Sequence, residues 1–285
     1  MRIRHSTGLL LCIVFGISAV GCGGASGEES ASQGKPVSLP HAEWARGELC
    51  SLTPRRVADI FPGESSAFPT NLVHVNGGLL FTADDGIHGR ELWRSTGEGR
   101  GTVLVKDFQP GPASGLGSDQ PLARQGPFVY FSASDSAHGN ELWKSDGTAA
   151  GTVLIKDILP GPEGSAPAGL TWVDGVLYFT ADDGVNGREL WRSDGTPEGT
   201  FLLKELVPGP GEFLLSELTA WGDTLAFVAF SGSEVSLWKT DGTPEGFVRI
   251  TTLAGNAIFF DLTPAKDLLY FLSHPDRGTH LDDAP

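Results

Sequence analysis

VDGVLYFTADDGVNGRELWRSDGTPEGTFLLKELVPGP, residues 173–210, is a 38-residue unit that decides the fold because the chain repeats it. Ungapped copies begin at Val75 and Gln125, and a fourth copy, from Trp221, keeps LWKTDGTPEG but has one residue fewer before its tryptophan. The repeated tryptophans are 50, 48 and 47 residues apart: Trp93, Trp143, Trp191 and Trp238. Repeats of this length are typical of the blades of β-propellers.

Each unit is expected to form four antiparallel strands, because its apolar runs are short, rich in aromatic or β-branched residues, and bounded by Gly, Asp or Pro. In the third copy the strands are expected near 169–174, 176–181, 188–193 and 200–206. Asp174-Gly175 fits a tight hairpin turn, and the segment 194–199 fits a longer hairpin loop. Pro208-Gly209-Pro210 cannot continue a central strand, so it ends the blade.

The ends of the repeat region are incomplete in complementary ways. The whole units lie near 75–112, 125–162, 173–210 and 221–257, and they are flanked by partial units at 55–63 and 259–285. The first partial unit matches the last strand of a blade, and DLLYFLS, residues 267–273, matches a second strand. We therefore expect an all-β propeller of about five blades, the last one closed by strands from both ends of the chain. The alternative is an open or truncated arc.

The repeated cores are GRELWRSTGEGRGT, GNELWKSDGTAAGT, GRELWRSDGTPEGT and VSLWKTDGTPEGF. They resemble the bacterial ELWxxDGT repeat family, over residues from about 57 to 272. The resemblance implies an exported repeat protein with a propeller-like pattern and no established general activity. Two departures predict altered loops: Thr96 replaces the Asp of the motif in the first copy, and Ser236 replaces the Glu in the fourth.

A second resemblance concerns packing. The spacing of Ala, Asp, Gly and Trp in three copies is similar to the tryptophan-docking motif of quinoprotein propellers. The resemblance implies that the tryptophan packs between neighbouring blades, and only this packing role is carried over; no quinone or other cofactor is expected. The expected docking residues are Trp93, Trp143, Trp191, Trp238, Asp85, Asp135, Asp183, Gly89, Gly139 and Gly187.

The first 21 residues are expected to be an export signal, with Arg2 and Arg4 before the apolar stretch Leu9–Val20. Ala19-Val20-Gly21-Cys22 resembles the lipobox of bacterial lipoproteins, although Ala19 departs from the usual Leu. This resemblance implies lipid attachment at Cys22, with outer-membrane sorting. The alternative is an ordinary signal peptide and a periplasmic or secreted protein.

Beyond the signal, residues 22–40 are rich in Gly and Ser and should form a flexible tether, followed by the repeat domain at 41–285. If Cys12 is cleaved off and Cys22 carries lipid, Cys50 has no partner for a disulfide. It is expected to be a small core residue. The formal net charge of −15, without a basic run in the mature region, argues against nucleic-acid partners.

Acidic side chains are the first candidates for metal binding or catalysis. Asp84-Asp85 and Asp182-Asp183 offer oxygen ligands for calcium, but they lack the D-x-D-x-D spacing. The set also erodes, since the second copy has Ser134-Asp135-Ser136 and the fourth has Ser231-Gly232-Ser233. Capping of backbone amides in the turn is the favoured role, and no metal is expected. Glutamates that recur at one strand position indicate a repeated hydrogen bond and not a catalytic pair: Glu91, Glu141 and Glu189.

The residues that do not repeat are scattered without any catalytic motif: His74, Glu212, Glu217, His274 and His280. The sequence therefore predicts no catalytic residues and favours a noncatalytic envelope scaffold that binds a protein or glycan partner. The candidate binding loops are 112–124, 162–169 and 210–219, with Phe213 as a contact. The alternatives are a propeller hydrolase or lyase acting on extracellular polysaccharides or peptides, and a degenerate relative of longer repeat proteins.

Overall fold

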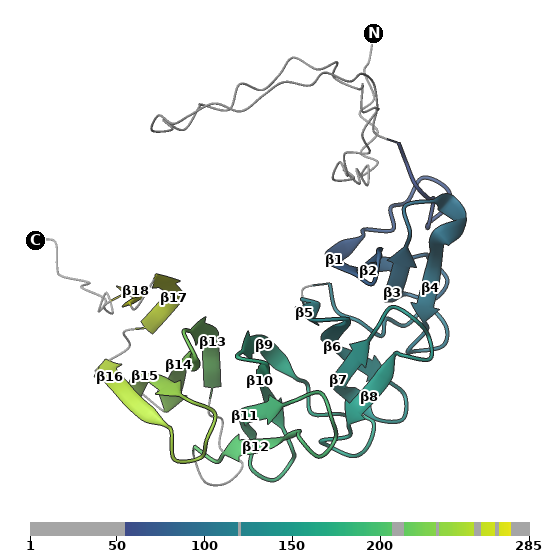
Figure 1. The fold of residues 1–285 in the computed structure, drawn as a ribbon. Helices are drawn as coiled ribbons and strands as arrows, with labels where there is room; N and C mark the ends of the chain where they lie inside the picture. The colour runs from purple at the N-terminus through teal and green to yellow at the C-terminus, as the bar shows by residue number, and fades with distance from the viewer. Residues whose placement is uncertain are drawn as a thin grey trace, which may run out of the picture.

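The computed structural model describes residues 55–118, 121–206, 214–231, 234–253, 258–265 and 268–274. These residues form antiparallel sheets built from strands that are consecutive in the chain (Figure 1). No helix among them is long and apolar enough to cross a membrane. The predicted signal peptide, the tether, Cys22 and Cys50 lie outside the described residues.

Four sheets have four strands each, and we call them blades 1 to 4. Blade 1 consists of β1 (Thr70–Val75), β2 (Gly78–Asp84), β3 (Arg90–Ser95) and β4 (Thr102–Lys106), with the 3₁₀ turn η1 (Gly99–Gly101) before β4. Blade 2 consists of β5 (Ala123–Gln125), β6 (Phe128–Asp135), β7 (Gly139–Ser145) and β8 (Val153–Lys156). Blade 3 consists of β9 (Ala168–Val173), β10 (Val176–Asp182), β11 (Arg188–Ser193) and β12 (Phe201–Lys204).

Blade 4 consists of β13 (Leu214–Trp221), β14 (Thr224–Ser231), β15 (Glu234–Thr240) and β16 (Val248–Leu253). It is followed by a two-stranded sheet, β17 (Ile258–Ala265) and β18 (Leu268–His274), which we call the half-blade. Every blade is a meander in which each strand pairs with the next one along the chain. The fold is therefore all-β and of the β-propeller type, as the repeat predicts.

In blade 3, each observed strand begins and ends within two residues of the position expected from the sequence. Asp174 and Gly175 have φ values of 45° and 79°, so both take the left-handed conformation of a type I′ hairpin turn. Asn76 and Gly77 form the matching turn in blade 1, with φ values of 47° and 70°. The hairpin predicted at Asp174-Gly175 is confirmed.

The blades are arranged along an open arc (Figure 1). The first strand of each blade, β1, β5, β9 or β13, lies on the concave side, and the fourth, β4, β8, β12 or β16, lies on the outside. Strands β1, β13 and β17 carry a bulge at one equivalent position, where Asn71, Glu217 and Asp261 have φ values of 56°, 55° and 58°. Gly169 holds this position in blade 3, with a φ of 67°.

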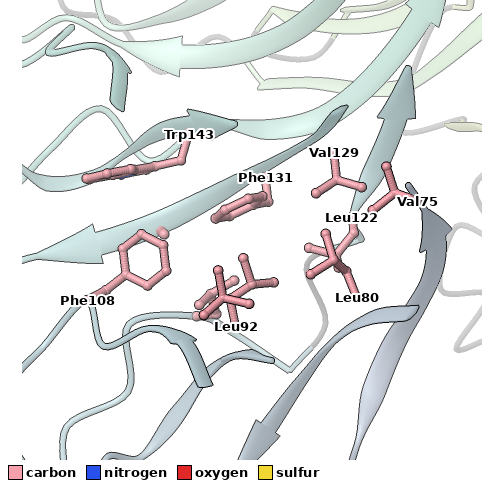
Figure 2. Close-up of a cluster of buried hydrophobic side chains, with 11 residues drawn as sticks. Val75, Leu80, Leu92, Phe108, Leu122, Val129, Phe131 and Trp143 are labelled. Carbon is pink, nitrogen blue, oxygen red and sulfur yellow. The ribbon is translucent and has the colours of Figure 1, made fainter. Parts of the chain in front are cut away.

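The hydrophobic core consists of separate clusters, each shared by two neighbouring blades. Figure 2 shows the first cluster, in which Val75, Leu80, Leu92 and Phe108 from blade 1 and its linker face Val129, Phe131 and Trp143 from blade 2. The Phe108 ring lies edge-on to Trp143, with 5.0 Å between ring centroids, and edge-on to Phe131 at 5.9 Å. Equivalent clusters join blade 2 to blade 3, blade 3 to blade 4, and blade 4 to the half-blade.

The repeated tryptophans occupy equivalent places on the face that each blade turns toward its predecessor. Trp143 and Trp191 are only 5% and 6% exposed, and Trp238 packs against the cluster between blades 3 and 4. Trp93 points to the face of blade 1 that no described blade covers, and it is partly exposed. The Nε1 atoms of Trp93, Trp143 and Trp191 have no hydrogen-bond partner among the described residues, so these indoles contribute by packing.

The described residues do not form a closed fifth blade. The half-blade strands pair only with each other, and residues 55–63 form no strand, so the open arc is the arrangement that the structure has. The physical reason is that residues 57–61 already lie against blade 1. A Cβ placed on Gly86 would come within 2.5 Å of the Phe61 ring, just as one on Gly184 would come within 2.8 Å of Leu159. The N-terminal segment thus occupies the place of the linker from a preceding blade.

Replacing Trp191 by Ala should remove an indole wedged between two blades. Truncation of a buried Trp typically costs about 3–5 kcal/mol, so we expect a clear fall in the free energy of unfolding and in Tm. Trp93→Ala is the matched control and should cost less, because no complete blade covers that side chain. Thermal and urea unfolding of both variants measure the difference, and equal losses would contradict the docking role.

Candidate functional site

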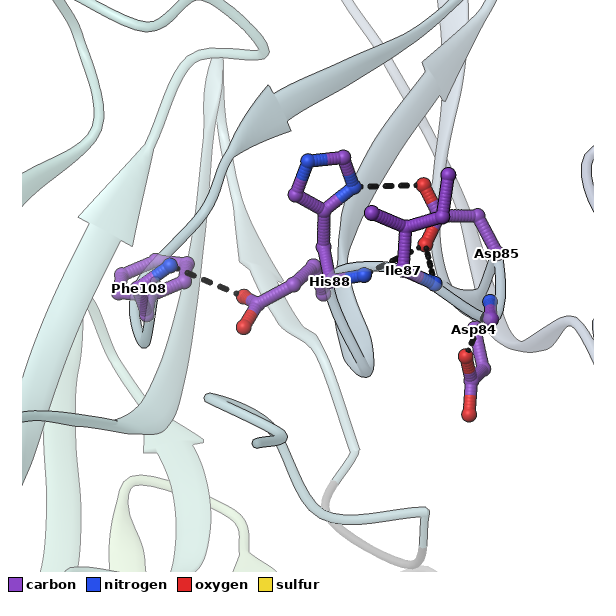
Figure 3. Close-up of polar contacts among 7 residues, drawn as sticks. Asp84, Asp85, Ile87, His88 and Phe108 are labelled. Carbon is purple, nitrogen blue, oxygen red and sulfur yellow. Dashed lines mark hydrogen bonds and ion pairs between the residues drawn. The ribbon is translucent and has the colours of Figure 1, made fainter. Parts of the chain in front are cut away.

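The most buried charged groups of the repeat are its glutamates. Glu91 is fully buried, and its carboxylate accepts hydrogen bonds from the backbone N–H groups of Phe108 at 3.2 Å and Gly115 at 2.9 Å. Phe108 lies at the start of the linker that leads to blade 2, and Gly115 lies near its middle. Figure 3 shows the bond to Phe108. One side chain therefore ties the start of the linker to its middle.

The other copies repeat this arrangement. The Glu141 carboxylate accepts from the backbone N–H of Leu159 at 2.9 Å and of Ser165 at 3.0 Å, and from the Ser165 hydroxyl. The Glu189 carboxylate accepts from the N–H of Leu206 at 3.1 Å. The recurrent hydrogen bond that the sequence predicts for these glutamates is confirmed.

Burial raises the pKa of Glu91 from its ordinary value of 4.5 to about 7. The hydrogen bonds from the Phe108 and Gly115 amides act in the opposite direction, and the nearby Asp107 adds to the rise. Burial also raises the pKa of Glu141, against the bonds from Ser165 and Leu159. These shifts have a structural cause, since each carboxyl is enclosed by the linker it binds.

The aspartates of the loop between the second and third strands cap that loop. Asp85 Oδ1 accepts from the N–H groups of Ile87 at 2.9 Å and His88 at 2.8 Å, and Asp85 Oδ2 lies 2.7 Å from His88 Nδ1 (Figure 3). Burial alone would raise the pKa of Asp85, but the bonds from His88 and Ile87 lower it. The hydrogen bond to Asp85 in turn raises the pKa of His88.

Blades 2 and 3 have the same capped loop. Asp135 binds the N–H groups of Ala137 and His138, and Asp183 binds those of Val185 and Asn186. Asp84 and Asp182 each accept from the N–H two residues ahead, that of Gly86 or Gly184. The carboxylates considered for calcium thus cap turn amides. Within the described ranges, no three His, Cys, Asp or Glu side chains gather as metal ligands.

The DGT loops at the opposite end of each blade connect neighbouring blades. Asp194 accepts from the N–H and the hydroxyl of Thr196, which closes the loop on itself. Gly195 has a φ of 89°, and a Cβ there would lie 2.5 Å from the Tyr130 hydroxyl of blade 2. Lys144 of blade 2 donates to the Gly195 carbonyl at 2.7 Å. The glycine of the motif is thus needed for both its conformation and the space that it leaves.

The two departures from the motif change these local structures. At Thr96 the Asp–Thr bonds are missing, and the loop instead forms the short turn η1, with the Thr96 N–H donating to the Gly101 carbonyl at 3.1 Å. Ser236, in place of Glu, accepts from Trp238 Nε1 at 3.0 Å. The altered loop expected in the first copy is confirmed. Sequence reasoning did not foresee the bond between Ser236 and Trp238.

The predicted catalytic and binding candidates are spread along the arc. His74 is exposed on β1, and Glu217 is exposed on β13, where its carboxylate accepts from the Leu262 N–H at 3.4 Å. The structure does not bring these two together, since β1 and β13 belong to blades 1 and 4 (Figure 1). His274 ends β18. Glu212, His280 and Phe213 lie outside the described residues.

The structure has an exposed row of apolar loop tips that the sequence pattern does not indicate. Ile87 and Val185 occupy equivalent tips of the capped loops and are 66% and 70% exposed; Ala137 is the equivalent residue in blade 2. The linker loops lie beside them, because a Cβ on Gly139 would come within 2.4 Å of the Glu163 backbone. The described parts of the predicted loops 112–124 and 162–169 therefore share one end of the blades with these tips.

Stability should depend on pH through Glu91. The folded protein binds the Glu91 proton more tightly than the unfolded chain does, so the free energy of unfolding should fall as pH rises from about 4.5 to about 7. Glu91→Gln mimics the protonated carboxyl and should remove this part of the slope. Glu98→Gln, in an exposed loop of the same blade, is the control. Urea titrations at several pH values test this, and an unchanged slope in Glu91→Gln would contradict it.

No family model and no curated protein sequence matches this chain. Solved structures with a similar fold include a puromycin hydrolase mutant complexed with PGG (20% identity, TM-score 0.43, covering 64% of this chain and 30% of that one). Others are a putative TolB from Agrobacterium tumefaciens (11% identity, TM-score 0.41, covering 66% and 68%) and a nidogen/laminin complex (16% identity, TM-score 0.39, covering 71% of each). Similarity at these levels concerns the fold and says nothing about activity.

Proposed function

We propose that this protein is a noncatalytic binding scaffold of the cell envelope that holds a partner on the end of the blades where the capped loops and linkers lie. This proposal is supported by the contacts of the repeated carboxylates. Glu91, Glu141 and Glu189 are buried and bonded to linker backbone, and Asp85 and its equivalents cap turns. These groups build the scaffold and are not presented to a substrate.

The exposed residues at the same end favour a protein partner over a glycan. Ile87 and Val185 are aliphatic tips that project beyond the Asp caps, and the caps hold the loops in one conformation. Rigid loops lose little conformational entropy on binding, and exposed aliphatic side chains gain most from contact with an apolar protein surface. Loops on a fixed scaffold are the usual place for such contacts.

Replacing Ile87 and Val185 together by Ser should weaken partner capture by about tenfold or more, since each buried aliphatic side chain contributes about 1.5–3 kcal/mol. The immobilised chain is used to capture proteins from a native envelope extract, and captured proteins are quantified by mass spectrometry. Val103 and Val153, which are exposed on the outer strands β4 and β8, are replaced by Ser as the control.

Two results would contradict the scaffold proposal. One is equal capture by the tip variant and the control. The other is turnover by the purified chain of any member of a panel of polysaccharides and peptides, which would favour a hydrolase or lyase instead.

We also propose that the chain is anchored through a lipid on Cys22, which rests on the lipobox-like Ala19-Val20-Gly21-Cys22. Cys22→Ser should move the protein from the membrane fraction to the soluble fraction and abolish labelling by a palmitate analogue. Cys50→Ser is the matched control and should change neither result. Continued membrane partition of Cys22→Ser would contradict the anchor.

A further inference from the structure

The half-blade exposes side chains whose counterparts elsewhere are buried between blades. Tyr270 pairs with Thr263 as Tyr178 pairs with Thr171, so the two tyrosines are equivalent. Tyr130 and Tyr178 are 5% and 3% exposed, whereas Tyr270 is 57% exposed. Leu268, two residues before it on the same face of the strand, is 60% exposed. This end of the arc therefore presents an apolar blade interface without a described blade to cover it.

The buried counterparts show what such a tyrosine binds. The Tyr130 ring lies edge-on to Trp172 of the next blade, with 4.8 Å between ring centroids. The Tyr130 hydroxyl reaches the place where Gly195 of that blade has no side chain, and the Tyr178 hydroxyl does the same at Gly242. Both tyrosines thus lie against a following blade that has a glycine in its DGT loop, and Tyr130 also contacts a ring on the inner strand of that blade.

Blade 1 carries the complementary surface at the other end of the arc. Leu72 is 46% exposed, although its counterparts Leu122 and Leu262 are 6% and 7% exposed under a preceding blade. His74 is exposed at the position of Trp172, and Gly97, with a φ of 88°, is the counterpart of Gly195 and Gly242. Trp93 is partly exposed on the same face. The two ends therefore fit each other as successive blades do.

The residues at the bulge position also make polar contacts with the blade that follows or with the linker to it. Asn71 donates to the Ser118 carbonyl, on the way into blade 2, at 3.2 Å, and Glu217 accepts from the N–H of Leu262 in the half-blade at 3.4 Å. Asp261 stands at the same bulge position of the half-blade and is exposed. By this equivalence, the Asp261 carboxylate would accept from the backbone N–H of Leu72 in a following blade 1.

We propose that this chain associates head to tail, with the half-blade of one copy packed against the blade 1 face of a second copy through the contacts that join neighbouring blades. A second copy is the favoured occupant because the two ends of one chain lie apart across the open arc (Figure 1). Bringing them together would require new angles at buried interfaces that already pack closely. The interface is heterologous, so it leads to a ring or a filament and not to a symmetric dimer.

The test uses the purified chain and two variants, each of which blocks one end. Tyr270→Asp places a charge on the half-blade face, and Leu72→Asp places one on the blade 1 face. Val153→Asp, on the exposed outer strand β8 of an interior blade, is the control for an added charge. Sedimentation velocity should show concentration-dependent oligomers for the wild type and for Val153→Asp, and monomers for each end variant alone.

Mixing the two end variants gives the decisive result. Each retains the end that the other has lost, so an equimolar mixture should form dimers and nothing larger. Monomeric wild type, or a mixture that stays monomeric, would overturn the proposal and favour closure within one chain. Dimers of Leu72→Asp alone would also overturn it, because they would show pairing of two half-blades. If either variant lacks the wild-type circular dichroism spectrum, the Ser substitution at the same position, Tyr270→Ser or Leu72→Ser, takes its place.

Discussion

Packing of one blade against the next is the interaction on which this structure depends. A four-stranded sheet with two apolar faces cannot bury both of them alone. Each hydrophobic cluster here draws residues from two blades, and the indoles of Trp143 and Trp191 lie in these shared clusters. Stability is therefore approximately a sum over the interfaces along the arc, and the two end faces contribute least.

The linkers between blades are held by the same repeat. Glu91 and Glu141 each bind two backbone amides of the linker that follows their blade, at the cost of enclosing a carboxyl. That enclosure raises the pKa of Glu91 and of Glu141, which in an isolated site would suggest acid–base catalysis. Because the same geometry recurs in successive blades, the shift here marks a structural hydrogen bond.

Most of the fold could be predicted from the sequence, because each strand is short and bounded by residues with fixed conformational preferences. Asp174-Gly175 predicts its hairpin, and the recurrence of Glu91 predicts a structural bond. Closure could not be predicted, since the angle between blades depends on side-chain packing and not on local pattern. The bulges at Asn71, Glu217 and Asp261 were equally hidden, because non-glycine residues seldom adopt a positive φ. The apolar tips at Ile87 and Val185 gave a signal only once their exposure was known.

The equivalence of the contacts between blades has a consequence for how such a chain can change in length. The Lys144 bond to the Gly195 carbonyl recurs one blade later as the Arg192 bond to the Gly242 carbonyl, at 2.7 Å and 2.9 Å. A gene duplication that adds one unit of about 48 residues would thus insert a blade whose two surfaces already match those on either side. Loss of a unit would rejoin matching surfaces in the same way, so the number of blades is free to vary among descendants while every junction is preserved.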